Sequence, residues 1–337
     1  MRDSQGRTID YMRISITDRC NLRCRYCMPE NPEHVPVDEI LTFEEITKAV
    51  RSSASLGIRY IKITGGEPLV RKGCPGLVKM IKEVPGIEKV TLTTNGILLK
   101  QYLGQLIEAG IDGINISLDT LDGSRYREIT GRDSLPEVVS AIKTASASSV
   151  PIKINTVSLS MGFGKEWDSS LESEGNDWEK MTEIARDYPV DVRFIEMMPI
   201  GYGKQFTTVN HGELLKEMKQ HYPEMEKDNT LHGFGPAVYY KIPGFLGSIG
   251  FISAIHGKFC NRCNRIRLTS KGYLKTCLCY EAGADLRPIL RSGLEEKELE
   301  KQLSQVMKQA VLEKPAAHCF ENPGQVTEQG NMSMIGG

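Results

Sequence analysis

Three cysteines near the start of the chain are the residues whose spacing most clearly indicates chemistry. Cys20, Cys24 and Cys27 form a C-x3-C-x2-C array within eight residues. An odd number of thiols this close together does not suit a set of disulfides, and a zinc site usually closes with four ligands. Three thiolates without a fourth nearby suit an iron–sulfur cluster in which one iron stays open to another ligand. The alternative is three buried or reactive thiols that bind no metal.

Four more cysteines gather towards the other end of the chain: Cys260, Cys263, Cys277 and Cys279. Their number alone is compatible with a closed zinc ribbon. The last two are spaced as C-x-C, however, whereas such a ribbon uses C-x2-C knuckles. Arg265 and Arg267 would share one face of a strand, and guanidinium groups beside a metal favour an anionic or purine ligand. The remaining two cysteines, Cys74 and Cys319, are isolated and are expected to be small apolar residues.

The composition narrows the function classes. The 337 residues include 42 basic and 43 acidic side chains, so the formal charge of −1 argues against a nucleic-acid binder. There is no run of about 18 apolar residues, so no membrane span is predicted. The first ten residues carry no apolar segment of a signal peptide. The clustered cysteines and the polar first ten residues together favour a reducing, cytoplasmic compartment.

Six strands alternating with helices are predicted, at residues 11–16, 58–63, 90–93, 111–118, 151–157 and 190–195. Thr42 and Glu45 have the spacing of a capping box at the start of the first helix. The alternation predicts an α/β fold with parallel strands and right-handed crossovers. Polar residues follow the strand ends, which is where α/β barrels place their active sites. Because six units are fewer than the eight of a closed barrel, we expect a partial, open (β/α)6 barrel over residues 1–200.

Residues 201–337 differ in character and are rich in glycine and proline. Short strands are predicted at residues 238–242 and 248–252. We expect this part to form a C-terminal layer that closes the mouth of the barrel and carries the second cysteine group. Residues 158–177 contain several glycines, serines and acids and are expected to form a surface loop after the fifth strand.

Two lysines lie within predicted strands, each flanked by isoleucines. Lys62 and Lys153 would be costly on a face covered by helices, so each is expected to point inwards to an anion. With Arg13 on the first strand, they favour a polyanionic ligand. The alternative for either lysine is an inward ion pair with a carboxylate.

The first array, with Tyr26 just before its third cysteine, resembles the signature of the radical S-adenosylmethionine (SAM) superfamily. The Cys-Asn-x-x-Cys-Asn-Arg-x-Arg motif that begins at Cys260, followed by Gly272, is similar to the GTP 3′,8-cyclase family of molybdenum cofactor biosynthesis. The ending Met334-Ile-Gly-Gly337 is similar to that family's Gly-Gly tail, which is thought to reach into the active site. The resemblance covers nearly the whole chain, although residues 158–177 are longer than the family's connection.

The resemblance implies SAM, two [4Fe-4S] clusters and a GTP site. By motif, the ligands of the first cluster are Cys20, Cys24 and Cys27, and those of the second are Cys260, Cys263 and Cys277, with Cys279 outside the pattern. The implied SAM-binding residues are Tyr26, Gly66, Glu67, Ser117 and Met198. The implied GTP-binding residues are Arg13, Lys62, Thr93, Lys153, Arg265 and Arg267. Arg265, Arg267, Gly336 and Gly337 would complete the catalytic site.

The implied reaction is the first step of molybdenum cofactor biosynthesis. GTP becomes (8S)-3′,8-cyclo-7,8-dihydroguanosine 5′-triphosphate through hydrogen abstraction at C3′ and attack on guanine C8. The implied partners are a downstream cyclic pyranopterin monophosphate synthase and a reductant protein that the sequence does not name; a homodimer is a further expectation. Two alternatives stay open: a twin-cluster radical SAM enzyme acting on a peptide or another small molecule, and a zinc-ribbon interaction protein.

Overall fold

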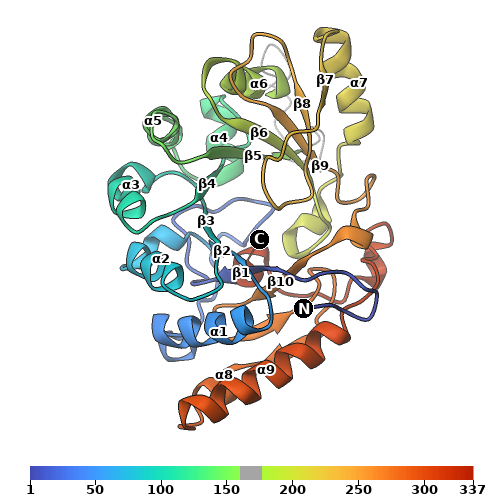
Figure 1. Cartoon of the computed structure of the whole chain (residues 1–337). Helices are drawn as coiled ribbons and strands as arrows, with labels where there is room; N and C mark the ends of the chain where they lie inside the picture. Colours follow the sequence, from blue (N-terminus) through green and yellow to red (C-terminus); the bar gives the residue numbers. More distant parts are fainter. Residues whose placement is uncertain (160–176, 337) are drawn as a thin grey trace.

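The computed structural model describes residues 1–159 and 177–336, and a single twelve-stranded sheet organises them (Figure 1). The strands are β1 (Tyr11–Ser15), β2 (Tyr60–Thr64), β3 (Lys89–Thr94), β4 (Gly113–Ser117), β5 (Ile152–Ser158), β6 (Asp191–Glu196), β7 (Glu226–Asp228), β8 (Val238–Lys241), β9 (Ile249–Ile252), β10 (Arg265–Leu268), β11 (Tyr273–Lys275) and β12 (Gly283–Asp285). Their order across the sheet is β12-β11-β10-β1-β2-β3-β4-β5-β6-β9-β8-β7.

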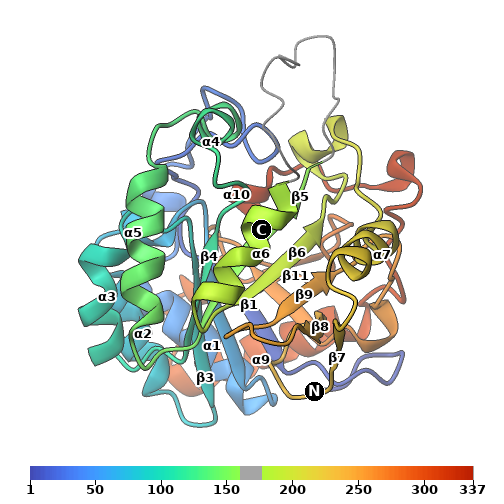
Figure 2. The same ribbon diagram turned by 90° about the horizontal axis from the view of Figure 1, so that it is seen from above.

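Helices connect the strands and cover the outside of the curved sheet (Figure 2). They are α1 (Phe43–Ser55), α2 (Cys74–Lys82), α3 (Leu99–Glu108), α4 (Gly123–Thr130), α5 (Leu135–Ser146), α6 (Asp177–Asp187), α7 (His211–His221), α8 (Arg287–Leu290), α9 (Glu296–Leu312) and α10 (Met332–Ile335). Short 3-10 turns are η1 (Val37–Glu39), η2 (Pro68–Val70), η4 (Gly201–Gln205), η5 (Cys260–Arg262) and η6 (Pro323–Gln325). The predicted capping box opens α1: Glu45 N donates to Thr42 Oγ1, and Thr42 N donates to Glu45 Oε2.

The six predicted strands pair in parallel from β1 to β6, as the alternation with helices predicts. The C-terminal part differs from the expected separate layer, because it continues the same sheet at both edges. β10 pairs in parallel with β1, and β9 pairs in parallel with β6. The remaining strands, β11 and β12 on one side and β8 and β7 on the other, are antiparallel. These additions lengthen the arc of the open barrel.

Alternation along each strand separates an apolar face from a polar one. Met12 and Ile14 are fully buried in the core under the helices, whereas Arg13 between them lines the inside of the barrel. Ile61 and Ile63 flank Lys62 in the same way. Successive side chains of a strand point to opposite faces. The Ile-Lys-Ile pattern therefore places the isoleucines under the helices and the lysine on the inner face of the barrel.

The predicted loop at residues 158–177 lies almost wholly outside the described residues. Its two ends are fixed: β5 runs through Ser158, and α6 begins at Asp177. Thr120 Oγ1 donates to Asp177 Oδ1 at 3.1 Å, and Arg125 forms an ion pair with the same carboxylate. The chain therefore leaves and re-enters the barrel at defined positions.

Candidate active site

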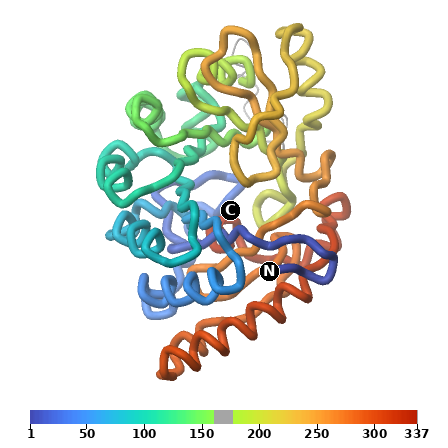
Figure 3. The backbone as a smooth tube through the Cα atoms, in the orientation of Figure 1, coloured from blue at the N-terminus to red at the C-terminus, as the bar shows by residue number. Residues whose placement is uncertain are grey.

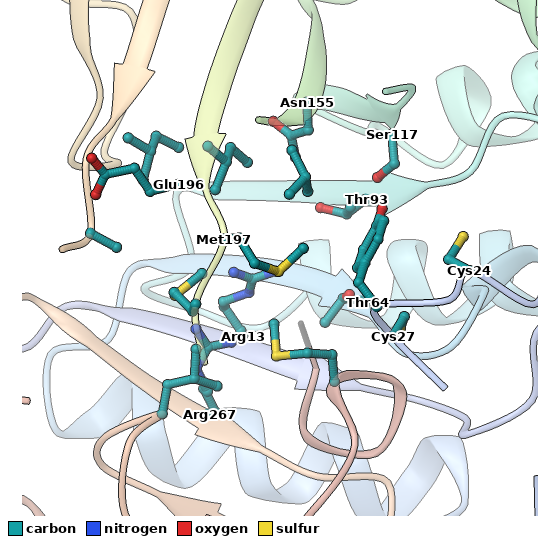
Figure 4. A pocket seen from close by; sticks show the side chains of 18 of the residues that line it. Arg13, Cys24, Cys27, Thr64, Thr93, Ser117, Asn155, Glu196, Met197 and Arg267 are labelled. Carbon is teal, nitrogen blue, oxygen red and sulfur yellow. The ribbon is translucent and has the colours of Figure 1, made fainter. Parts of the chain in front are cut away.

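A cavity opens at the carboxyl ends of the parallel strands, where the sequence predicts the active site. Its volume of about 320 Å³ lies within the range of small-molecule sites. Predicted site residues on its wall are Arg13, Cys20, Cys24, Tyr26, Cys27, Gly66, Thr93, Ser117, Met198, Cys260, Cys263, Arg265, Arg267 and Cys277. Figure 4 shows Cys24 and Cys27 on one side of the cavity and Glu196 on the opposite side. Both cysteine groups thus face one space, although they are far apart in the sequence.

The first cysteine loop is held by main-chain contacts with the turn after β2. Gly66 N donates to Thr17 O at 2.7 Å, and a Cβ atom on Gly66 would lie 2.4 Å from Arg19 O. A side chain at this position would collide with the loop backbone, so the close approach requires glycine. Within the loop, Cys27 N donates to Cys24 O at 2.8 Å. The turn therefore fixes the segment that presents the three thiols.

Burial dominates the acid–base behaviour of these thiols. It raises the pKa of Cys20 to about 11 and that of Cys27 to about 12, and it raises the pKa of Cys24 well above its ordinary value. The neighbouring thiols and Asp119 raise the pKa of Cys24 further. Only the thiolate form binds metal. Because burial favours the protonated thiols, the positive charge of iron would have to stabilise the thiolates when a cluster binds.

Tyr26 is held by a carboxylate to which the sequence alone assigns no role. Tyr26 Oη donates to Asp119 Oδ2 at 2.7 Å, and Val157 N donates to Asp119 Oδ1 at 2.8 Å. Burial raises the pKa of Asp119 to about 6. Asp119 lies just beyond the end of β4 and lines the cavity together with Ser117. The only feature of the sequence that could have indicated this role is the position of Asp119 just after a predicted strand.

Glu67 does not offer a carboxylate to a ligand, and that expectation is wrong. The side chain is 1% exposed, and its oxygens accept hydrogen bonds from Leu69 N at 3.0 Å, Thr94 Oγ1 at 2.8 Å and Asn95 N at 2.6 Å. Burial raises its pKa to about 7 despite these donors. Glu67 therefore joins the turn after β2 to the end of β3, behind the cavity wall.

Buried cations line the inside of the barrel below the cysteine loops. Lys62 is 9% exposed, and in residues 1–159 and 177–336 no hydrogen bond or ion pair of its ammonium group is found. Burial lowers the pKa of Lys62 well below its ordinary value, and the charges of Arg193 and Arg13 lower it further. Burial likewise lowers the pKa of Arg13 to about 10. Arg193, on β6, is a member of this group that the sequence prediction missed.

Lys153 adopts the alternative arrangement, an ion pair with a carboxylate. Its Nζ lies 2.9 Å from Asp191 Oδ2 and donates to Tyr239 Oη at 3.1 Å and to the main-chain oxygen of His232. His232 Nδ1 contacts Asp191 Oδ2 at 2.9 Å, and His232 Nε2 contacts Asp228 Oδ2 at 2.7 Å. This network joins the starts of β5 and β6 to the segment between β7 and β8. Neither Lys153 nor Lys62 lines the cavity wall, and the two differ in that Lys153 has a carboxylate partner, whereas none is found for Lys62 among the described residues.

The second cysteine group lies in a cationic environment. Burial alone would raise the pKa of Cys263, but the charges of Arg265 and Lys314 outweigh it and lower the pKa to about 7. Lys314 Nζ donates to Arg265 O at 3.1 Å and to Thr276 O, so it joins the strands on either side of this group. The Arg265 guanidinium lies 4.9 Å above the ring of Phe259. Lys314 was missed because nothing in its local sequence marks it.

The cysteines outside the motif lie behind the cavity wall. Cys74 is buried at the start of α2. Cys279 and Cys319 are buried in a small apolar cluster, with their Sγ atoms 3.2 Å apart. Cys279 therefore faces Cys319 and is not on the cavity wall with Cys277.

The end of the chain reaches into the barrel, as the resemblance implies. Arg267 Nη1 donates to Gly336 O at 2.5 Å. Gly336 has φ 73°, and a Cβ atom there would lie 3.1 Å from Thr64 Cγ2 and 3.4 Å from Ser15 Cβ. The left-handed conformation and the tight approach both favour glycine. Gly337 lies outside the described residues.

The donor atoms fit iron–sulfur clusters. Each cysteine group contributes three thiols to the wall of a shared cavity. Three thiolates per group are the ligand set of a cluster that leaves one iron open.

Comparisons with known proteins agree with this chemistry. The profile of the Radical SAM superfamily matches residues 14–173, and that of Molybdenum Cofactor Synthesis C matches residues 190–320. The GTP 3′,8-cyclase of Clostridium perfringens (strain 13 / Type A) is 42% identical over 338 residues and 100% of both chains. That of Moorella thermoacetica is 42% identical over 343 residues, again 100% of both. The chain belongs to the GTP 3′,8-cyclase family.

Membership of the GTP 3′,8-cyclase family makes the chain a radical SAM enzyme that uses SAM and an iron–sulfur cluster. Its fold is similar to that of Streptococcus suis SuiB bound to S-adenosylmethionine, with a TM-score of 0.65 and 14% identity over 95% of this chain and 76% of SuiB. That similarity confirms the predicted radical SAM fold. Among the described residues, no helix is long and apolar enough to cross a membrane.

Proposed function

We propose that the chain converts GTP to (8S)-3′,8-cyclo-7,8-dihydroguanosine 5′-triphosphate, the first step of molybdenum cofactor biosynthesis. The observation that carries the proposal is that two cysteine triads and the arginines Arg13, Arg265 and Arg267 line one cavity. Two sets of cluster ligands beside a cationic wall suit an anionic nucleotide that is held while a radical is generated next to it. The curated relatives with this name support the choice of nucleotide.

The part of the cavity formed by the first cysteine loop is proposed to bind SAM. Cys20, Cys24 and Cys27 would hold the first [4Fe-4S] cluster. When bound and reduced, such a cluster supplies the electron that cleaves SAM to methionine and a 5′-deoxyadenosyl radical. The protein's part is to hold and orient SAM through the cavity-lining residues of this part, which are Tyr26, Gly66, Ser117 and Met198.

The second cysteine group is proposed to hold a second [4Fe-4S] cluster through Cys260, Cys263 and Cys277. We therefore assign radical formation to residues 1–200. Residues 201–337 would hold the cluster that binds the guanine. Arg267, held against Gly336 O, and Arg265 complete the wall here. Gly337 extends the same tail and is assigned to this site with it.

The triphosphate is proposed to lie along the inner face of β1 and β2. Arg13 and Lys62 occupy paired positions of these strands, and among the described residues Lys62 has no carboxylate partner that would compete with a phosphate. Thr93 would add a hydroxyl from β3. Lys153 can reach a phosphate only by leaving Asp191, so we assign it a smaller contribution than Lys62.

The rival within radical SAM enzymes is a twin-cluster protein that acts on a peptide; SuiB has been solved bound to a precursor peptide. The pairing of Arg267 with the Gly336 tail favours a small anionic substrate over a peptide, because the tail occupies the space beside Thr64. The zinc-ribbon interaction protein is a weaker alternative, because it gives the buried cations no role.

An anaerobic assay tests the proposal. The protein is reconstituted with iron and sulfide and reduced, SAM is added, and 5′-deoxyadenosine is measured with and without GTP. We expect GTP-dependent 5′-deoxyadenosine and an equal amount of cyclised nucleotide. SAM cleavage that is indifferent to GTP would favour the peptide-directed alternative, and colourless, zinc-loaded protein would favour the interaction protein.

The proposed setting follows from the chemistry. Open clusters and free thiols require a reducing compartment, so we expect the enzyme in the cytoplasm. The cyclised nucleotide needs a consuming enzyme, for which we propose the cyclic pyranopterin monophosphate synthase. The clusters need a reductant protein that remains to be identified. We keep the homodimer as an expectation that light scattering would test.

A further inference from the structure

The turn at the start of the chain contains a buried arginine that is not part of the cavity wall. Arg2 and Thr8 form an isolated bridge, which places Asp3 and Arg7 inside the turn. Arg7 Nε donates to Asp3 Oδ2 at 2.6 Å, and Asp3 Oδ1 accepts hydrogen bonds from Arg7 N at 2.9 Å and Gln5 N at 3.0 Å. Both side chains are buried. The carboxylate therefore fixes the direction in which the guanidinium points.

The free edge of this guanidinium reaches two distant segments. Arg7 Nη1 donates to Cys260 O at 2.9 Å and to Ala316 O at 2.8 Å, while Nη2 donates to Pro315 O at 2.7 Å. Figure 3 shows the same proximity: the blue start of the chain lies beside red segments from its end. A planar fork with fixed donors can bind three carbonyl oxygens at once, and an ammonium group would not reproduce this geometry.

One contacted segment contains a cysteine of the second group, and the other packs beside that group. Cys260 is one of its proposed ligands. Pro315 and Ala316 directly follow Lys314, which binds the carbonyl oxygens of Arg265 and Thr276. Farther along the same segment, His318 N donates to Cys260 Sγ at 3.4 Å. Arg7 thus ties the cysteine turn η5 to the segment that packs over it.

We propose that Arg7 is a positioning residue for the second cluster. It holds Cys260 against the segment at residues 314–318 and so fixes the position of one cluster ligand. The inference rests on the proposed second cluster and adds the residue that assembles its site. Groups that orient metal ligands from behind set metal affinity, and their loss typically costs about 10–100-fold. The first cysteine loop has its own main-chain contacts and does not touch Arg7 in the described structure.

The test compares wild type with Arg7→Gln, Arg7→Lys and Arg2→Gln. Arg2 lies in the same turn but is exposed, and it is the matched control. After anaerobic reconstitution, iron and sulfide per chain are measured, with electron paramagnetic resonance of the reduced protein and 5′-deoxyadenosine formation. We expect Arg7→Gln to lose roughly half of its iron, the share of one of two four-iron clusters, and to keep the first cluster's signal and SAM cleavage. Arg7→Lys should lie between Arg7→Gln and wild type, and Arg2→Gln should match wild type.

Hydrogen exchange of the metal-free proteins gives a second readout, in which Arg7→Gln should expose the amides of residues 258–264 and 314–319 more than those of residues 18–28. Equal loss of both clusters, or two clusters with wild-type spectra in Arg7→Gln, would overturn the inference. Wild-type protein that takes up only one cluster would overturn the second cluster itself and leave SAM cleavage as the test of the radical enzyme.

Discussion

The thiols of the first cysteine group come from one loop of eight residues, whereas those of the second are spread over residues 260–277 and are contacted by a more distant segment, in which His318 N donates to Cys260 Sγ. Main-chain hydrogen bonds brace the first loop. Two buried cations, Arg7 and Lys314, brace the second. The charges differ in the same way: an acid, Asp119, adds to the raised pKa of Cys24, whereas cations bring the pKa of Cys263 down to about 7.

This difference suggests a division of tasks. A short, self-contained loop with the carboxylate of Asp119 beside Cys24 suits a cluster that must give up an electron, because nearby negative charge favours the oxidised form. A cationic site suits a cluster that has to share its space with an anionic nucleotide. The same three-thiol donor set can therefore serve two purposes through its surroundings alone.

The largest expected effect comes from removing one proposed cluster ligand from each group in turn. Cys24→Ser should reduce 5′-deoxyadenosine formation to background, because it removes a ligand of the cluster beside SAM. Cys263→Ser should keep SAM cleavage and abolish the cyclised nucleotide. Both variants should lose a similar amount of iron, so iron content serves as the matched control. Loss of SAM cleavage in both would contradict the division.

Arg267→Ala should reduce cyclisation by roughly 10²–10³-fold, the usual cost of losing a charged donor in an active site. SAM cleavage should fall much less, because Arg267 contacts the Gly336 tail and not the first loop. The ratio of cyclised nucleotide to 5′-deoxyadenosine measures this uncoupling. Gly336→Ala, which crowds Thr64, should lower the same ratio to a smaller extent. An unchanged ratio in both variants would remove the tail from the site.

Lys62 and Lys153 should respond in opposite ways to replacement by methionine. Lys62→Met removes a buried charge for which the described part of the chain offers no partner, so the nucleotide-free protein should melt at a higher temperature, while GTP affinity falls about 10–100-fold. Lys153→Met leaves Asp191 with His232 but without its ammonium partner, so the melting temperature of this variant should fall. Calorimetry measures both. A stabilised Lys153 variant would show that the ion pair with Asp191 does not contribute to stability.

The pH dependence of the Lys62 effect has a definite sign. Because the folded-state pKa is lowered, the unfolded chain binds more protons, and wild-type stability rises with pH until the ordinary value of 10.5 is reached. The stabilising effect of Lys62→Met should therefore shrink between pH 7 and pH 9.5. A constant difference in melting temperature would mean that Lys62 stays protonated in the folded protein over this range, so that its pKa is not lowered as the burial indicates.

The smallest effect concerns thiol reactivity in the metal-free protein. At pH 7, Cys263 should be alkylated at least about tenfold faster than Cys27, because only its pKa lies near that pH. Arg265→Gln should slow Cys263 by a few-fold and leave Cys27 unchanged. Mass spectrometry of peptides after timed iodoacetamide treatment measures both rates. Equal rates would mean that the two environments do not differ as the charges indicate.

Local patterns in the sequence predict much of this molecule. The alternation of strands and helices predicts the open parallel barrel, and cysteine spacing predicts both ligand groups. What the sequence does not reveal are partners distant along the chain. Nothing near Arg7 or Lys314 shows that each binds carbonyl oxygens of the second group. Glu67 was misassigned for a related reason: a carboxylate in a turn can face a ligand or accept backbone hydrogens, and only the fold decides which.

The pairing of β10 with β1 has a consequence for the order in which the protein folds. The first strand to be synthesised has its final neighbour about 250 residues later, because Tyr11 pairs with Arg265. Until that neighbour is made, β1 is an edge strand whose backbone groups on one side are free to pair with another chain. Sequence-distant parallel pairing is also slow to form. During synthesis, the open edge of β1 is therefore where we expect aggregation to begin and chaperones to bind.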